Sequence, residues 1–275
     1  MTIRAALACI GMAIGLGAPL SSTATAKGWP TPAAGESASG DVELLLTFDD
    51  GPNPETTPKV LDLLKERKLH AIFFMVGEMV DPKKTKKAAA IVQRILDEGH
   101  VIATHTWRHR DLCKIKADDA AAEIDHGREL IEKASGFRTA WFRTPGGVRC
   151  TRLEEMLAER HLAHFHWDID SQEWKKDRTV EKVVKMITND IARAQSRSVV
   201  LMHDTKKIVV QALPEILKFV DEENIRRAKS NKKRIRFLEP SVLAREQLTP
   251  GLAAWVAEAT ANLRELPRML ATILP

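Results

Sequence analysis

The sequence predicts an α/β fold built on a parallel sheet. From residue 42 onward, short apolar runs typical of buried strands alternate with longer amphipathic runs typical of helices. The alternation continues to residue 238 without an internal repeat. Strands separated by helices pair in parallel through right-handed crossovers, in a closed barrel or an open wound sheet. The 275 residues suit one domain, because single-domain α/β barrels commonly reach about 250 residues.

The expected elements follow from this periodicity. Strands are expected at residues 42–48, 70–76, 100–104, 140–143, 163–167, 198–202 and 235–238. Helices are expected at residues 57–67, 84–98, 117–134, 151–160, 180–194 and 209–222. The amphipathic pattern of each helix predicts that one of its faces packs against the sheet.

The two ends of the chain differ in composition from the predicted domain at 42–240. Residues 1–26 have Arg4 near the start, then an apolar stretch, then a small-residue end, which is typical of a signal peptide. We therefore expect an exported protein, periplasmic or extracellular, with no stable membrane insertion after cleavage. Residues 27–41 are rich in Gly, Ser, Pro and Ala and indicate a flexible lead. Residues 241–275 indicate a C-terminal helical extension, either packed on the domain or lying on a membrane surface.

Charge and cysteine content limit the partners and the compartment. The net charge of +5 is too small to indicate nucleic-acid binding, and no nucleic-acid motif accompanies it. A modest positive field would help the chain approach an anionic polymer. After signal cleavage Cys113 and Cys150 remain, and the sequence leaves open whether they form a disulfide or stay as thiols. The oligomeric state is also open.

Polar residues cluster where the predicted strands end. Reactive groups gather at the carboxyl edge of a parallel sheet, because all of its strands end at that edge. Five polar segments have this position: TFDDGP from Thr47, HTWRH from His105, RTPGG from Arg143, DSQEW from Asp170, and LMHD from Leu201.

Two of these segments supply ligands that could bind one metal ion. His105 and His109 are four residues apart and could face one ion from a single helical turn, and a carboxylate from Asp49 or Asp50 would complete the set. Three protein ligands leave a position for water, as in catalytic zinc sites. A pair of surface histidines is the alternative. The second aspartate would then handle protons, and His203 could donate one to a leaving group.

The same segments resemble those of a known family. The chain is similar, from about Glu43 to Leu238, to the NodB-type polysaccharide deacetylases, which are metal-dependent carbohydrate esterases. All five segments recur in the order found in that family. The resemblance implies a distorted seven-stranded (β/α) barrel, a zinc cofactor and a polysaccharide substrate.

The resemblance also implies residue roles. Asp50, His105 and His109 would bind zinc, Asp49 would be the general base and His203 the general acid. The role of Arg143 would be to hold Asp49 ionised, and the carboxylate of the DSQEW segment would tune His203. Leu201 and Trp174 would line the pocket for the acetyl methyl group.

The chain departs from the family pattern at two positions. Gly146 occupies a position where the family usually has an aromatic residue; its backbone N–H can still serve the oxyanion, but a wall of the sugar groove is lost. Glu173 stands where Asp is usual, and its extra methylene could move the carboxylate away from His203. Asp170 is the reserve candidate for that contact.

Three classes of function fit these residues. The first is removal of acetyl groups from a polysaccharide such as peptidoglycan, chitin-like oligomers, an exopolysaccharide or acetylated xylan, with basic charge and export favouring peptidoglycan. The second is hydrolysis of an amide in a small metabolite on the same fold. The third is a catalytically silent glycan-binding protein, which would normally have lost Asp49 or a metal ligand.

Overall fold

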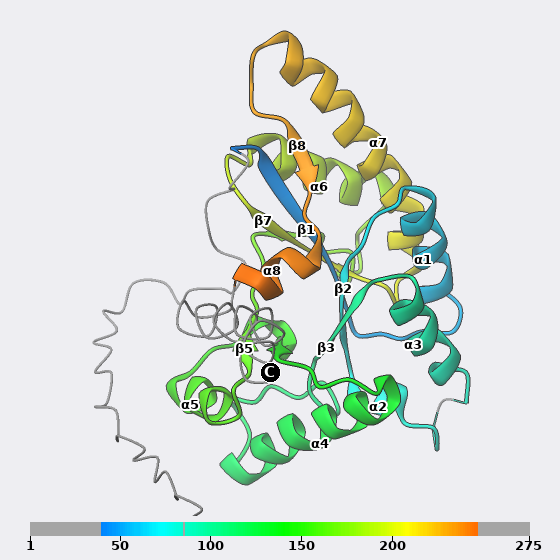
Figure 1. The fold of residues 1–275 in the computed structure, drawn as a ribbon. Coiled ribbons are helices and arrows are strands. Elements are labelled where there is room, and N and C mark those ends of the chain that lie inside the picture. Colours follow the sequence, from blue (N-terminus) through cyan, green and yellow to red (C-terminus); the bar gives the residue numbers. More distant parts are fainter. Residues whose placement is uncertain (1–39, 85, 247–275) are drawn as a thin grey trace, which may run out of the picture. The chain divides into compact units, whose positions relative to one another are not determined.

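The computed structural model describes residues 40–84 and 86–246 and contains a parallel sheet with helices packed against it (Figure 1). The strands are β1 (Val42–Asp49), β2 (Ile72–Met75), β3 (Val101–Thr104), β4 (Trp141–Phe142), β5 (Ala163–His164), β6 (Ile169–Asp170), β7 (Ser198–His203) and β8 (Ile235–Phe237). Their order is β5-β4-β3-β2-β1-β7-β6, with β8 also paired to β1, and every pairing is parallel. The predicted parallel α/β fold is confirmed.

The helices lie between strands, as the periodicity predicted. They are α1 (Thr57–Glu66), α2 (Gly77–Val80), α3 (Ala88–Asp97), α4 (Ala117–Ser135), α5 (Thr151–Glu159), α6 (Val180–Arg193), α7 (Lys207–Lys229) and α8 (Pro240–Glu246). Local sequence features determine where several of these helices begin or end. The Thr179 side chain caps α6 by accepting from the backbone N–H of Lys182, and Gly136 ends α4 at a φ of 75°.

Strand β1 is buried on both faces and lies in the middle of the sheet. Leu44, Leu46 and Phe48 belong to the outer cluster formed with the helices, whereas Leu45 belongs to a second cluster inside the sheet's curve. Side chains alternate along a strand. Thr47 and Asp49 therefore share the inner face with Leu45, which directs a carboxylate into the interior at the end of β1.

The inner cluster shows that the sheet is curled. The side chains of Leu45 on β1, Trp141 on β4 and Phe165 after β5 belong to one buried group, although several strands separate β1 from β5 in the order. The rings of Phe165 and Trp141 have centroids 5.1 Å apart, and those of Phe165 and Phe74 are 5.5 Å apart. A flat sheet could not bring these residues together.

The strand expected at 163–167 is shorter than predicted, because β5 ends at His164 and a separate short strand, β6, begins at Ile169. The N–H of Phe165 still donates to the carbonyl of Phe142 on β4 at 2.7 Å, but the N–H of Asp168 donates to the carbonyl of Val199 on β7 at 3.0 Å. The chain therefore passes from one end of the sheet to the other within a few residues. With β5 and β6 regarded as one kinked strand, the expected seven-stranded barrel is recovered.

Other boundaries differ from the prediction for local reasons. The helix expected at 84–98 begins at Ala88, because the lysines before it offer no apolar face. Helix α7 continues to Lys229 rather than 222. Its last turns are highly charged, yet Arg227 is buried and donates to the carbonyls of Ala192 and Lys233 at 2.9 and 3.1 Å. Such contacts between different elements cannot be predicted from the hydrophobic periodicity of the sequence.

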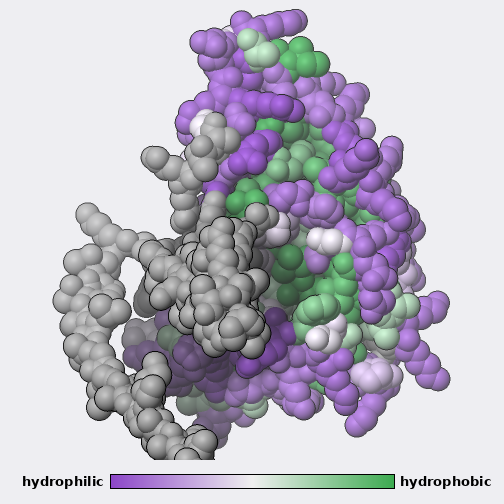
Figure 2. Space-filling model, in the orientation of Figure 1, coloured by the Kyte–Doolittle hydropathy of each residue, from purple (hydrophilic) through white to green (hydrophobic). Residues whose placement is uncertain are grey.

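The predicted terminal segments lie almost entirely outside the described residues. This applies to the signal peptide at 1–26, to the flexible lead up to residue 39 and to the extension from 247 to 275. The start of the extension forms α8, in which Leu243 packs into the inner cluster. None of the described helices is long and apolar enough to cross a membrane. The face drawn in Figure 2 is largely hydrophilic, with apolar side chains visible between the charged ones.

A disulfide joins Cys113 to Cys150, which answers the question that the sequence left open. Their Cα atoms lie 6.1 Å apart across a sequence separation of 37 residues. Cys113 follows the segment that contains His105 and His109, and Cys150 follows Gly146 and precedes α5. The bridge therefore ties together the loops that leave β3 and β4.

Replacing both cysteines by alanine should lower the free energy of unfolding by about 2–4 kcal/mol, because the unfolded chain is then no longer constrained by a closed loop. Urea denaturation of the wild type with and without dithiothreitol measures the effect. The double variant is the control, because reductant should not change its midpoint. A wild type that is equally stable in both conditions would contradict this role.

Candidate functional site

The polar strand ends meet at one edge of the sheet, as expected for parallel strands. Asp49 ends β1 and lies opposite His203, which ends β7, in the register of the two strands. His105 directly follows β3, and Arg143 directly follows β4. Four of the predicted segments thus converge around the last residues of β1.

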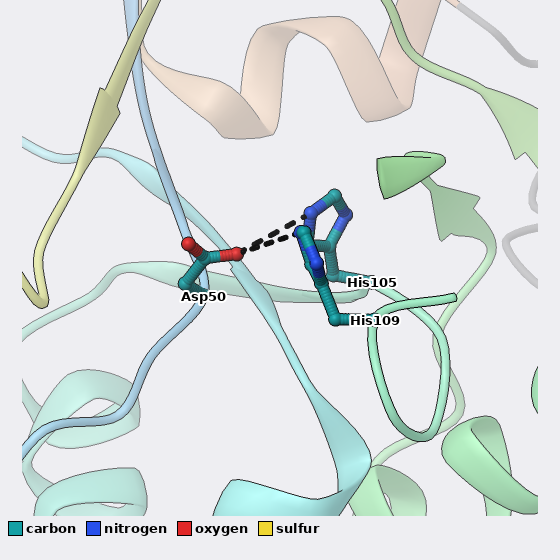
Figure 3. A group of neighbouring side chains, drawn as sticks. All are labelled: Asp50, His105 and His109. Carbon is teal, nitrogen blue, oxygen red and sulfur yellow. Dashed lines mark ion pairs between the residues drawn. The ribbon is translucent and has the colours of Figure 1, made fainter. Parts of the chain in front are cut away.

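Asp50, His105 and His109 form a cluster that could hold a metal ion (Figure 3). One ligand atom from each residue lies within 4.8 Å of the other two. Asp50 Oδ1 is 3.2 Å from His109 Nε2 and 3.6 Å from His105 Nε2. Of the two aspartates, Asp50 faces both imidazoles, and a φ of 74° at this residue turns the chain at the end of β1.

The expectation that both histidines project from one helical turn is wrong. His105 lies at the end of a strand, and the residues up to His109 form a loop rather than a helix. Thr106 and His109 adopt left-handed conformations with φ values of 69° and 58°. Such conformations cost about 1–3 kcal/mol each outside glycine. The imidazoles converge because the loop bends back on itself, which residue spacing alone does not reveal.

The hydrogen bonds and charges of this cluster suit a cation. His105 Nδ1 donates to the carbonyl oxygen of Arg143 at 2.7 Å, which leaves the Nε2 lone pair facing Asp50. Burial lowers the pKa of His105, so the ring is neutral. Asp50 Oδ1 is buried without a hydrogen-bond partner. Two imidazole nitrogens and a carboxylate oxygen are a donor set for a divalent transition metal, and these residues fit one.

Asp50 itself remains ionised. Burial raises its pKa, but contact with His109 and the proximity of His105 and His203 outweigh burial, so the net shift is downward. The carboxylate is therefore in the form that a metal ligand requires.

Asp49 forms a buried ion pair with Arg143. The Nη1 atom of Arg143 donates to Asp49 Oδ1 at 2.7 Å and to Thr47 Oγ1 at 2.8 Å. The Nη2 atom donates to the carbonyl of His166 at 3.2 Å, and the guanidinium carbon lies 4.0 Å from the centroid of the Phe74 ring. Burial lowers the pKa of Arg143, and the adjacent Asp49 opposes this. The second oxygen of Asp49 lies 3.7 Å from His105 Nε2.

His203 is held by Glu173 at two atoms. Glu173 Oε1 lies 2.7 Å from His203 Nδ1 and accepts the backbone N–H of His203 at the same distance. The longer side chain of Glu173 thus does reach His203. Asp170, the reserve candidate, instead accepts the backbone N–H of Gln172 at 2.9 Å. Burial lowers the pKa of His203, but the hydrogen bond to Glu173 and the nearby carboxylates raise it to about 9.

The residues expected to contact substrate differ in how exposed they are. Gly146 has a φ of 64°, and a Cβ built on it would meet no atom within 4 Å, so space is open beside it. Leu201 is buried on β7 between Thr47 and Asp170. Trp174 is 54% exposed, with Lys175 Nζ 5.3 Å from the centroid of its ring. Their predicted contacts with an acetyl group remain predictions.

Sequence reasoning missed several supporting residues. Thr47 accepts from Arg143 and donates to Val200 O at 2.8 Å, while Ser171 donates to Glu173 Oε2. Both belong to segments already singled out, but the residue types alone did not predict these partners. Glu123 in α4 accepts the backbone N–H of Arg108 at 2.7 Å, and no sequence signal connects it with the site.

Asp204 is another buried carboxyl group with no predicted role. It accepts a hydrogen bond from Thr57 Oγ1, and burial raises its pKa to about 7. A Cβ on Gly51 would lie 2.3 Å from its Oδ2 atom. Only glycine therefore allows the chain after Asp50 to pack against the end of β7.

Comparison with known proteins gives a consistent family assignment. Residues 37–163 match the family described as polysaccharide deacetylase. The chain is 33% identical over 181 residues to peptidoglycan-N-acetylmuramic acid deacetylase PdaC of Bacillus subtilis, a match that covers 66% of this chain and 36% of that protein. It thus spans well under half of PdaC.

One further relative and one solved structure are matched over more of their length. The chain is 31% identical over 175 residues to a chitooligosaccharide deacetylase of Sinorhizobium fredii, covering 61% of this chain and 74% of that protein. The solved structure of PdaC from Bacillus subtilis superposes with a TM-score of 0.61 at 28% identity, covering 82% of this chain and 98% of that structure. The chain belongs to the polysaccharide deacetylase family.

Proposed function

We propose that this chain hydrolyses N-acetyl groups on the amino sugars of a polysaccharide, releasing acetate, with zinc as its metal. The observation that carries the proposal is the convergence of Asp50 Oδ1 with the Nε2 atoms of His105 and His109, next to the buried Asp49. Nitrogen and oxygen ligands from three residues, with room for water, are typical of catalytic zinc sites.

Asp49 acts as the general base. Asp50, His105 and His109 would hold a divalent cation, which would supply Lewis acidity to polarise the acetamide carbonyl and make water more acidic. Asp49 accepts the proton of the attacking water through Oδ2, because its other oxygen is occupied by Arg143. The Arg143 guanidinium fixes the orientation of the carboxylate.

His203 acts as the general acid. Its raised pKa, about 9, keeps the ring protonated at neutral pH. With Nδ1 engaged by Glu173, only Nε2 can donate a proton to the departing sugar nitrogen. That nitrogen must be protonated as the C–N bond breaks, so the products are acetate and a free amine.

The Gly146 backbone N–H donates to the developing oxyanion, and Leu201 and Trp174 surround the acetyl methyl group. The open space beside Gly146 leaves room for a bulky sugar neighbour where a larger side chain would intrude.

The substrate that we favour is peptidoglycan or a chitin-like oligomer. The matched relatives are named for peptidoglycan N-acetylmuramic acid and for chitooligosaccharides. The net charge of +5 assists approach to an anionic wall polymer. The signal-like residues 1–26 and the Cys113–Cys150 bridge both suit an exported protein, periplasmic or extracellular.

Acetate release tests the function directly. Purified protein is incubated with peptidoglycan, chitopentaose and acetylxylan, with and without a chelator and with zinc added back. We expect acetate from one of the amino-sugar polymers, lost with chelator and restored by zinc. Release from acetylxylan alone would indicate an O-acetyl esterase. Release from none of the three would count against polysaccharide deacetylation and favour a small-metabolite amidohydrolase.

Asp49 and His105 should behave differently when substituted. Asp49→Asn should retain bound zinc and lower kcat by about 100-fold to 10,000-fold, because the acceptor of the proton is gone. His105→Ala should lose zinc and activity together. Zinc content per protein and steady-state kinetics measure both. Equal zinc loss in the two variants would contradict the assigned roles.

The Glu173 carboxylate should set the alkaline limit of activity. His203 must be protonated to act as the acid, so activity falls as pH rises through its pKa. Glu173 raises that pKa, and Glu173→Gln should therefore move the alkaline limb of kcat/KM about 1–2 units toward lower pH. Asp170→Asn is the control, because Asp170 bonds to Gln172 instead. A limb that does not move in Glu173→Gln would exclude His203 as the acid.

A further inference from the structure

The loop that carries His109 is the least regular part of the metal cluster. His105 is fixed at the end of β3 and by its bond to the Arg143 carbonyl. The side chain of His109, by contrast, is 46% exposed and sits at the far end of a loop with left-handed Thr106 and His109. Such conformations persist in non-glycine residues only where surrounding contacts enforce them. The position of His109 therefore depends on what holds the loop.

Residues of two helices, α2 and α4, form hydrogen bonds with the backbone of this loop. At the start of α2, the N–H groups of Gly77 and Glu78 donate to the carbonyls of Thr106 and Trp107, each at 2.9 Å. The N–H of His109 donates to Thr106 Oγ1 at 3.0 Å. The N–H of Arg108 donates at 2.7 Å to Oε2 of Glu123, which lies in the second turn of α4.

Glu123 is an unusual residue to find in this position. It is 2% exposed, and no Lys, Arg or His among the described residues forms an ion pair with it. Burial of a carboxylate without a cation is unfavourable unless its oxygens accept hydrogen bonds. The short bond from Arg108 N–H is such a hydrogen bond. Its effect is to fix the backbone one residue before His109.

Gly127, one turn further along α4, allows the helix to reach the loop. A Cβ at this position would lie 2.5 Å from the carbonyl carbon of Thr106 and 2.6 Å from the backbone nitrogen of Trp107. Gly77 packs against the same point, since its Cβ would lie 2.8 Å from the Cα of Gly127. Only the absence of a side chain permits this backbone-to-backbone contact.

We propose that Glu123 and Gly127 are positioning residues for the metal site, which set its affinity by holding the loop of His109 in the ligating conformation. Neither touches the site directly. Both act through the backbone of Thr106 to Arg108, so that the imidazole of His109 already faces Asp50 before a cation arrives. The inference rests on the proposed function only in that the cluster binds a divalent cation.

A matched pair of variants isolates the hydrogen bond. Glu123→Met keeps an unbranched side chain of similar length but has no strong acceptor, and Glu123→Gln keeps a carbonyl that can accept from Arg108. The dissociation constant for zinc is measured on the full chain by competition with a chromophoric chelator. We expect it to rise about 10-fold to 100-fold in Glu123→Met, and to stay within about threefold of wild type in Glu123→Gln because an acceptor remains.

Two more variants separate positioning from general stability. Ile124→Ala removes a fully buried side chain from the next position of α4. It should lower the melting temperature of the metal-free protein without changing zinc affinity. Gly127→Ala should weaken zinc binding as Glu123→Met does, because the added methyl group displaces Thr106.

Unchanged zinc affinity in both Glu123→Met and Gly127→Ala would overturn the inference while leaving the proposed function intact. The same holds if Ile124→Ala weakens zinc binding as much as Glu123→Met does. Wild-type protein that binds no zinc and releases no acetate would defeat the proposed function and the inference with it. Wild-type zinc binding without acetate release would defeat only the function.

Discussion

The arrangement of the site depends on Arg143, which connects several strands at once. Its guanidinium holds Asp49 from β1, and its carbonyl accepts the Nδ1 proton of His105 after β3. It also donates to His166, in the segment where the chain passes from β5 to β6. One buried residue thus orients the proposed base, fixes the tautomer of a proposed metal ligand and bonds to the kink between β5 and β6. A substitution here would disturb all three together.

Such a site is built at a cost in stability. Arg143 and Asp49 are both buried, and desolvating an ion pair commonly offsets most of its attraction. Glu123 and Asp204 are further buried carboxyl groups. Apolar residues of similar size could often stabilise a core as well or better. The proposed reaction would account for Arg143 and Asp49, because charges held in a dry and rigid surrounding need little rearrangement during reaction. The surrounding apolar clusters and the disulfide supply stability that these groups do not.

The sequence was sufficient to predict what depends on local pattern. Alternating periodicity predicted the parallel sheet and most helix positions, and the polar strand ends predicted that the segments containing Asp50, His105, Arg143 and His203 would meet at one edge of the sheet. Prediction from the sequence failed where the structure depends on contacts between residues on different elements. The kink between Phe165 and Asp168 depends on hydrogen bonds from their N–H groups to two different strands. The hydrogen-bond partner of Glu123 likewise lies on a different element. Residue spacing suggested a helical HxxxH motif, whereas contacts from α2 and α4 impose a loop.

The two departures from the family pattern affect different parts of the site. At Glu173 the extra methylene is accommodated, because Oε1 accepts two N–H groups of His203 while Oε2 accepts the hydroxyl of Ser171. The proton-handling geometry is thereby kept with a longer side chain. At Gly146 no atom fills the space that a side chain would occupy. The departure at Glu173 is thus accommodated by neighbouring buried residues. The space at Gly146, on the solvent-facing side, stays open to a substrate. Under the proposed function, a different sugar would be accommodated at Gly146 without disturbing Asp49 or His203.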